Sequence, residues 1–230
     1  PGEASAAGFQ LSDAPVIAID GPSASGKGTV AQRVAATLGF HHLDSGALYR
    51  LVALAAARSG VDASDEAAVA AVAVRLPARL EGGEVSLDDG RVTDDIRTEE
   101  CSVAASFVAA LPAVRQALLR RQHAYRNPPG LVAEGRDMGS VVFPDAGLKV
   151  FLTASLEARA ERRLKQLKEK GIAATLAALL QDLRERDSRD ATRSVAPLKQ
   201  CPGARLLDTT SMNAEQAAAR IVGWYRGTNG

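Results

Sequence analysis

The chain has few of the residues that build metal centres or disulfide frameworks. Its 230 residues include two cysteines, Cys101 and Cys201, and three histidines. The cysteines are far apart in the sequence, in no C-x-x-C motif and beside no histidine, so we expect neither a zinc site nor a disulfide framework. Two free thiols are the simpler expectation.

The chain also lacks an excess of charge of one sign. It has 28 basic and 27 acidic residues and a net charge of +1, so no overall field favours nucleic acid or a membrane surface. No apolar run approaches the roughly 20 residues that a membrane span needs. Residues 1–15 have neither the basic start nor the apolar run of a signal peptide. We therefore expect small-molecule partners, with any anion site built locally.

Short apolar segments alternate with segments of helical periodicity along most of the chain. The apolar fraction of 46% is enough for one large core. The expected strands are residues 16–19, 40–43, 131–134, 148–152 and 205–208, and the expected helices between or after them include 27–38, 156–170, 173–190 and 213–225. This alternation predicts an α/β fold with an open parallel five-stranded sheet flanked by helices.

Residues 63–128 have a different pattern of predicted helices and strands. A helix over 64–76 is followed by short strands within 79–93, broken by Gly82-Gly83 and Asp89-Gly90, and then by helices over 99–108 and 112–126. We predict a small α+β insertion here. The domain organisation is then core at 15–62, 129–155 and 193–228, the insertion at 63–128, and two charged lid helices at 156–192 joined at Gly171.

A glycine-rich stretch lies between the first strand and the first helix, as a phosphate-binding loop requires. It runs Gly21, Pro22, Ser23, Ala24, Ser25, Gly26, Lys27, Gly28, Thr29. Glycines let successive amides point at a polyphosphate on the helix N-terminus, and Lys27 adds a cation. The spacing matches G-x-x-x-x-G-K, but Gly28 stands where Ser or Thr is usual, so the motif does not predict direct coordination of Mg²⁺ by a loop hydroxyl.

Other polar clusters follow the expected strands and should reach the same edge of the sheet. Asp44-Ser45 follows the second strand and Gly135-Arg136-Asp137 the third. In the run 184–193, Arg186, Arg189/Asp190 and Arg193 have the spacing of one helical stripe that could meet several phosphate oxygens, although a solvated helix face fits the spacing equally well. A second set of basic side chains is Arg159, Arg162 and Arg163 on the preceding helix.

The balance of these groups bears on the reaction. An alcohol acceptor would need a base, for which Asp44 or Asp137 is available, whereas a phosphate monoester is already anionic and needs none. Abundant arginine without a candidate catalytic histidine favours the phosphate acceptor. The alternatives are a kinase of a small alcohol, such as a shikimate-type enzyme, or a nucleotide switch. Against a GTPase switch, the chain has neither N-K-x-D nor D-x-x-G.

Four stretches resemble the bacterial cytidylate kinases, within the nucleoside monophosphate kinases. They are G-P-S-A-S-G-K-G-T at 21–29, L-D-S-G-A-L-Y-R at 43–50, E-G-R-D-M-G-S-V-V-F-P-D-A at 134–146 and R-D-S-R-D-A-T-R-S-V-A-P-L at 186–198. The resemblance implies ATP-dependent phosphorylation of CMP and dCMP with Mg²⁺, in a cytoplasmic monomer. A kinase of UMP or AMP remains an alternative.

The resemblance also implies roles for individual residues. Arg50, Arg136 and Arg193 would hold the acceptor phosphate, with Ser45 beside them, and Lys27, Arg136 and Arg193 would act in catalysis. Arg186 and Asp190 would hold the ribose, while Ser106, Arg115 and Asp137 would read the base. A carboxylate and a hydroxyl facing the exocyclic amine, with an arginine facing the ring acceptors, would distinguish cytosine from uracil.

Overall fold

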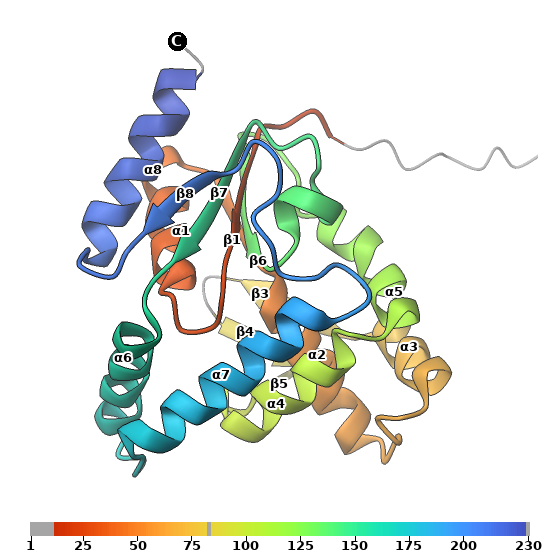
Figure 1. The fold of residues 1–230 in the computed structure, drawn as a ribbon. Coiled ribbons are helices and arrows are strands. Elements are labelled where there is room, and N and C mark those ends of the chain that lie inside the picture. Colours follow the sequence, from red (N-terminus) through yellow and green to blue (C-terminus); the bar gives the residue numbers. More distant parts are fainter. Residues whose placement is uncertain (1–11, 82–83, 229–230) are drawn as a thin grey trace, which may run out of the picture.

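The central sheet contains five parallel strands. The structure, a computed structural model, describes residues 12–81 and 84–228. The strand order is β2-β6-β1-β7-β8, with every pairing parallel. Of these strands, Figure 1 labels β6, β1, β7 and β8. The strands are β1 (Val16–Asp20), β2 (His41–Asp44), β6 (Leu131–Gly135), β7 (Leu148–Thr153) and β8 (Arg205–Asp208). The predicted open parallel α/β sheet is therefore confirmed.

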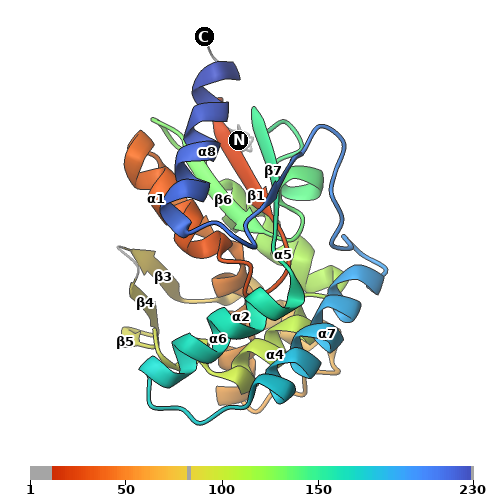
Figure 2. The same ribbon diagram turned by 60° about the vertical axis from the view of Figure 1, so that its left-hand side comes forward.

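The two faces of the sheet carry separate cores because side chains alternate along each strand. On one face Ile17 and Ile19 pack with α1 (Lys27–Leu38) and α8 (Ala214–Thr228). On the other face Val16 and Ala18 pack in a larger cluster with α2 (Ser45–Arg58). Both faces of β1 are thus buried, and the loop that follows it starts from a fixed strand end (Figure 2).

The segment between α2 and β6 contains a small sheet among helices, as predicted. Its elements are α3 (Glu66–Arg75), the antiparallel strands β3 (Ala78–Glu81), β4 (Glu84–Leu87) and β5 (Gly90–Arg91), α4 (Glu99–Val108) and α5 (Pro112–His123). The predicted Gly82-Gly83 turn lies outside the described residues, and the prediction that α5 reaches Arg126 is wrong. Among the described helices none could cross a membrane alone; α4 and α5 meet that length and composition only as a pair bent by 101°.

The two charged helices pack as a pair beyond the carboxyl ends of the strands, beside α4 (Figures 1 and 2). They are α6 (Leu156–Glu169) and α7 (Leu176–Thr192). The predicted start of α7 at residue 173 is wrong because Thr175 caps the helix, its side chain accepting from the amide of Ala178. The capping box predicted for α8 is confirmed, with Asn213 and Gln216 exchanging hydrogen bonds.

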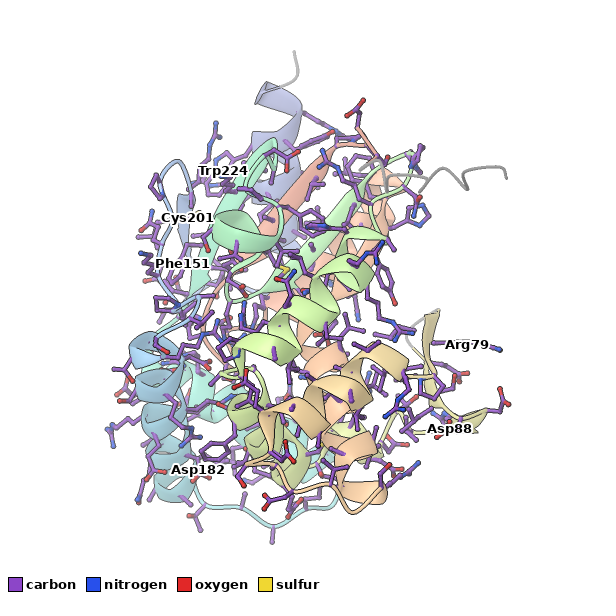
Figure 3. The ribbon with its side chains drawn as sticks, turned by 90° about the vertical axis from the view of Figure 1, so that its right-hand side faces the viewer. Arg79, Asp88, Phe151, Asp182, Cys201 and Trp224 are labelled. Carbon is purple, nitrogen blue, oxygen red and sulfur yellow. The ribbon has the colours of Figure 1, made fainter. Side chains whose placement is uncertain are left out.

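A short π-type helix (Met138–Val142) follows β6, which the sequence did not predict. Met138 and Gly139 are buried in it. Cys201 lies against this helix, since a Cβ added to Gly139 would come within 3.3 Å of its Sγ (Figure 3). Both cysteines are free thiols, as expected. The π-type helix matters because it begins directly after Arg136 and Asp137.

Candidate active site

The loop after β1 has the backbone shape that a phosphate-binding loop needs. Gly26 has φ +88° and immediately precedes α1, and Ala24 also lies in the left-handed region with φ 56°. A side chain at Gly21 is excluded because its Cβ would overlap the carbonyl oxygen of Leu152. The loop therefore presents the first amides of α1, which have no partner within the helix, toward the ends of the strands.

Lys27 is the buried cation of this loop. Its side chain is 9% exposed, and its Nζ donates to the carbonyl oxygen of Pro22 at 3.1 Å. Burial, and then the charge of Arg136, lowers the pKa of Lys27 to about 7, while the carboxylates of Glu134 and Asp44 oppose that shift. An ammonium group is thus held beside the loop amides and next to two carboxylates.

The absence of a hydroxyl at position 28 has a structural cause. A Cβ on Gly28 would lie 2.9 Å from Oε1 of Glu134, so the space that a Ser or Thr side chain would enter is taken by a carboxylate. Glu134 is buried near the end of β6, in register with Asp44 on the neighbouring strand β2. His42 Nε2 lies 3.6 Å from Oε1 of Glu134. Gly28 and Glu134 therefore form a complementary pair.

Arg136 connects the loop with the lid helices. Its Nη2 donates to Oγ of Ser23 in the loop at 2.8 Å, and its Nε donates to Oδ2 of Asp190 on α7 at 2.8 Å. Arg136 follows β6 directly, so one guanidinium joins the sheet edge, the loop and the lid. The prediction that the polar cluster after the third strand converges on the phosphate loop is confirmed for Arg136.

Other arginine side chains at this edge carry buried polar atoms without hydrogen bonds. Nε of Arg50, Nε of Arg186 and Nη2 of Arg193 have no hydrogen-bond partner among the described residues, although Nη2 of Arg193 lies 3.8 Å from Oδ1 of Asp137. Burial, with the like charge of Arg136 next, lowers the pKa of Arg186 to about 10. Arg50 is only partly satisfied, by Oδ2 of Asp44 at 2.7 Å from its Nη2. Since buried donors normally have acceptors, this arrangement is suited to an anion with several oxygens.

A second group of polar side chains lies between α4, α5 and the turn after β6. Arg115 and Asp137 form a buried ion pair through Nη2 and Oδ2, and Nη1 of Arg115 also donates to the carbonyl of Ala109 at 3.1 Å. The guanidinium carbon of Arg115 lies 5.8 Å from the ring centroid of Tyr49. Oγ of Ser106 is buried without a partner among the described residues. Donors and acceptors are therefore fixed along one wall.

The predicted second set of arginines is only partly right. Arg159 does not line the cavity: it pairs with both oxygens of Asp187, at 3.1 and 2.6 Å, and donates to the carbonyl of Ser23 at 3.2 Å. Its role is to fasten α6 to α7 and to the loop. Arg162 donates to the carbonyl of Ser25 at 3.0 Å, and Arg163 pairs with Glu99 on α4 at 2.8 Å.

The predicted stripe on α7 also needs one correction. Arg186, Asp190 and Arg193 line the cavity, but Arg189 does not. The guanidinium of Arg189 instead lies 5.5 Å from the ring centroid of Phe107 on α4. Neighbours in a helix point about 100° apart at 3.6 residues per turn, so Arg189 and Asp190 cannot face the same side.

One cavity of about 650 Å³ joins these groups. Predicted residues that line it are Ser23, Ala24, Ser25, Gly26, Lys27, Gly28, Thr29, Ser45, Arg50, Ser106, Arg115, Arg136, Asp137, Arg186, Asp190 and Arg193. Gly21 and Pro22 are not among the lining residues. The cavity therefore extends from the loop, past the arginines, to the wall formed by α4 and Arg115.

Sequence reasoning assigned no role to two buried carboxylates at this edge. Glu134 lines the cavity, and Asp20, the last residue of β1, lies behind it. Both are acidic residues inside otherwise apolar strands, which is a signal that could have singled them out. Ser102 on α4 was missed as well, although it is buried and lines the cavity.

Comparison with known proteins agrees with this geometry. The family model described as cytidylate kinase matches residues 17–226. The chain is 59% identical over 213 residues to a protein named cytidylate kinase from Bordetella bronchiseptica, covering 93% of this chain and 96% of that one. Similar matches are 58% identity to a cytidylate kinase of Chromobacterium violaceum (92% and 95% covered) and 56% to one of Nitrosomonas eutropha (92% and 94%). With a phosphate-binding loop, an arginine-rich cavity and matches of this extent, the chain belongs to the cytidylate kinase family.

Proposed function

We propose that the cavity binds ATP and CMP or dCMP side by side and that the protein transfers the γ-phosphoryl group of ATP to the monophosphate. In this reaction the bond between the γ-phosphorus and its bridging oxygen breaks, and an oxygen of the acceptor phosphate bonds to that phosphorus. The products are ADP and CDP or dCDP. Membership of the family supports the choice of nucleotides, and the unpartnered buried arginine atoms beside the loop carry the assignment of residues.

The donor would be held by residues 21–29. The loop amides and the N-terminus of α1 bind its β- and γ-phosphates, and Lys27 leaves the carbonyl of Pro22 to contact the γ-phosphate. Because the pKa of Lys27 is near 7, a bound polyphosphate has a second effect: its negative charge favours the ammonium form. Binding of ATP would thus keep Lys27 in the protonated form that contacts the γ-phosphate.

The acceptor phosphate would lie among Arg50, Arg136 and Arg193, with Ser45 beside it. Buried Nε of Arg50 and Nη2 of Arg193 supply donors that make no hydrogen bond to a described residue, the second lying 3.8 Å from Oδ1 of Asp137. Their charges offset the repulsion between the acceptor and the γ-phosphate, which would otherwise oppose the approach of two anions. No general base is needed, since the attacking oxygen is already ionised near neutral pH.

The nucleoside would extend from these arginines toward α4. Asp190 and Arg186 would hold the ribose hydroxyls, and Asp137, Ser106 and Arg115, which line the same cavity, would read the edge of cytosine. A carboxylate and a hydroxyl accept from the amino group, while Arg115 donates to the ring acceptors. Uracil presents a carbonyl in place of the amine, so it would face the carboxylate without a hydrogen bond.

Magnesium fits the same edge of the sheet. Among the described residues no group of three or more His, Cys, Asp or Glu side chains could hold a metal ion by itself. Mg²⁺ needs less, because it is usually bound by one or two carboxylates, waters and substrate phosphates. Glu134, with Asp44 next to it, supplies that chemistry where Gly28 leaves room for it. When bound, the ion would neutralise charge on the phosphates.

The lid helices would exclude water from the transfer. Arg163 on α6 pairs with Glu99 on α4, and Arg136 pairs with Asp190 on α7, so contacts cross the cavity from two directions. Water competes with CMP as phosphoryl acceptor, and a covered site reduces that side reaction.

A panel of acceptors tests this function. ADP release should be measured with Mg²⁺-ATP and, in separate reactions, CMP, dCMP, UMP, AMP and shikimate. We expect turnover with CMP and dCMP to exceed that with UMP by at least about tenfold, and turnover with shikimate to equal the no-acceptor control. Turnover with shikimate above that with CMP would favour a kinase of small alcohols and would contradict the proposal.

A further inference from the structure

Asp20 is a buried acid that the proposed reaction does not use. It is the last residue of β1 and is 5% exposed. In the sheet it lies between Gly135 on β6 and Phe151 on β7. It does not line the cavity, although the loop begins at the next residue. Its place behind the site calls for an explanation.

Both oxygens of Asp20 accept hydrogen bonds from the start of the π-type helix. Oδ1 accepts from the amide of Met138 at 2.7 Å, and Oδ2 accepts from the amide of Gly139 at 2.9 Å. The first amides of a helix have no partner within it, and these residues are buried away from water. The carboxylate therefore satisfies two donors that would otherwise be left unpaired.

Burial disfavours the charged form of the Asp20 carboxylate. Burial raises the pKa of Asp20 to about 6, against the two backbone hydrogen bonds, which lower it. The nearby charge of Asp137 raises it further, and that of Arg136 lowers it. No ion pair with Asp20 occurs among the described residues. An amide side chain would avoid the charge, but it offers one acceptor oxygen and would direct an N–H₂ group at a backbone N–H.

Met138 and Gly139, whose amides Asp20 accepts from, come directly after Arg136 and Asp137, the residues proposed to contact the acceptor. On one side of Asp137, the carbonyl of Gly135 accepts from the amide of Gly21 at 3.3 Å. On the other side, Asp20 holds Met138 and Gly139. The backbone of Arg136 and Asp137 is therefore tied to β1 at both ends, and Asp137 itself has φ −149° and ψ 22°, outside regular structure.

We infer that Asp20 is a positioning residue for the acceptor nucleotide: by clamping the turn after β6 to the strand that carries the phosphate loop, it sets where Asp137 and Arg136 stand. Through Asp137 the clamp also orients Arg115, its buried partner. The inference rests on the proposed placement of CMP beside Asp137. It separates two uses of β1, because the loop binds the donor while its last side chain organises the acceptor site.

The test is Asp20→Asn, which keeps the shape and removes one acceptor. Steady-state kinetics should be measured with CMP and with ATP as the varied substrate. We expect KM for CMP to rise about tenfold, as loss of a hydrogen bond to a charged group implies, with KM for ATP changed less than about twofold. The preference for CMP over UMP should narrow as well. A merely structural weakening would move both KM values together or leave both unchanged.

Asp208→Asn is the matched control. Asp208 also ends a strand of the same sheet, and its carboxylate accepts from the amide and hydroxyl of Thr210 within its own loop. It does not line the cavity, so its kinetics should match the wild type. Equal rises in KM for both substrates in Asp20→Asn, or no rise for CMP, would overturn the inference. A wild type without CMP turnover would instead overturn the proposed function.

A second variant decides the question if Asp20→Asn does not fold. Gly139→Ala leaves Asp20 intact, but its Cβ would lie 3.2 Å from Cγ of Lys149 and 3.3 Å from Sγ of Cys201, so either the turn or these two side chains must move by a few tenths of an ångström. We expect KM for CMP to rise about threefold, with KM for ATP unchanged. A crystal structure of the variant shows whether the turn has moved. An unchanged KM for CMP in a folded variant whose turn has moved, or an equal rise in KM for ATP, would overturn the inference.

Discussion

The two halves of the cavity are built in different ways. The proposed donor half is formed mainly by one continuous stretch, the loop 21–29, of which residues 23–29 line the cavity and whose main groups are backbone amides, glycines and one lysine. The proposed acceptor half is assembled from side chains on α2, α4, α5, α7 and the turn after β6. Its groups pair with one another across long sequence separations, as Arg136 does with Asp190.

This difference determines how large and how selective the effect of a substitution on activity should be. Contacts made by backbone amides cannot be removed by changing a side chain, and Lys27 is the only charged residue within 21–29. We therefore expect the proposed donor half to be lost mainly through Lys27. In the acceptor half, several partly paired arginines share the charge of one phosphate, and each side chain has a narrower task. We therefore expect a large single effect on one side and graded, substrate-specific effects on the other.

The largest effect should come from Lys27→Ala. It removes the cation beside the loop, and we expect kcat to fall about a thousandfold, as for loss of a preorganised transition-state donor. The fold should persist, because burial of this ammonium opposes folding at neutral pH: its pKa is about 7 in the protein against 10.5 unfolded. ADP release in a coupled assay and thermal unfolding measure the two expectations.

Lys170→Ala is the control for that comparison, since Lys170 is exposed at the end of α6. It should keep wild-type turnover. The pH dependence has a definite sign: the unfolded chain binds more protons at Lys27 between pH 7 and 10.5, so the wild type should gain stability relative to Lys27→Ala as the pH rises through that range. Unchanged turnover in Lys27→Ala would remove this residue from the mechanism.

A smaller and more selective effect should come from Asp137→Ala on the acceptor side. It removes the proposed partner of the cytosine amine and leaves Arg115 without its buried carboxylate. We expect the ratio of kcat/KM for CMP to that for UMP to narrow about tenfold or more. Separate measurements of kcat/KM for the two nucleotides, at saturating ATP, give that ratio.

Asp145→Ala controls for loss of a carboxylate in the same region, because Asp145 is 60% exposed and pairs with Arg126 on the surface. Its selectivity should equal that of the wild type. If Asp137→Ala lowered kcat/KM for CMP and UMP by the same factor, Asp137 would serve the phosphate or the metal rather than the base. The contrast between a general donor site and a base-reading acceptor site would then be lost.

The same contrast explains which parts of the molecule the sequence could predict. The strands, the loop and the capped helices follow from local patterns: β1 is an apolar run ended by the glycine loop, and α8 opens with a capping box. The π-type helix Met138–Val142 does not, because its first amides are satisfied by Asp20, more than a hundred residues away in sequence. A helix cap supplied by a residue so distant in the sequence cannot be predicted from a local pattern.

The residues of the site, too, could be predicted only in part from the sequence. Helical spacing placed Arg186, Asp190 and Arg193 on one stripe, and the structure brings them to the cavity. It could not exclude Arg189, which turns to Phe107, or Arg159, which is buried against Asp187. Spacing alone cannot separate such arginines, because the position of each side chain depends on which residues pack against it in the fold. Glu134 was missed because its meaning depends on Gly28, a residue from a different strand-to-helix junction.

The smallest expected effect, and the one that most sharpens the comparison, comes from Gly28→Ser. It restores the hydroxyl usual in such loops, but its Cβ would meet Oε1 of Glu134 at 2.9 Å and displace that carboxylate. If Glu134 serves Mg²⁺, binding of Mg²⁺-ATP measured by calorimetry should weaken about fivefold, while ATP with EDTA binds as to the wild type. KM for CMP should not change.

Two companions make the Gly28→Ser result decisive. Gly28→Ala adds the Cβ without the hydroxyl, so a weaker loss in Ser than in Ala would mean that the new hydroxyl partly replaces the carboxylate at the metal. Gly147→Ser puts the same side chain where nothing lies within 4 Å and should behave as the wild type. Equal weakening with and without Mg²⁺ would mean that position 28 acts on the loop backbone alone. The donor site would then depend on amides and Lys27, without the help of a side chain from the neighbouring strand.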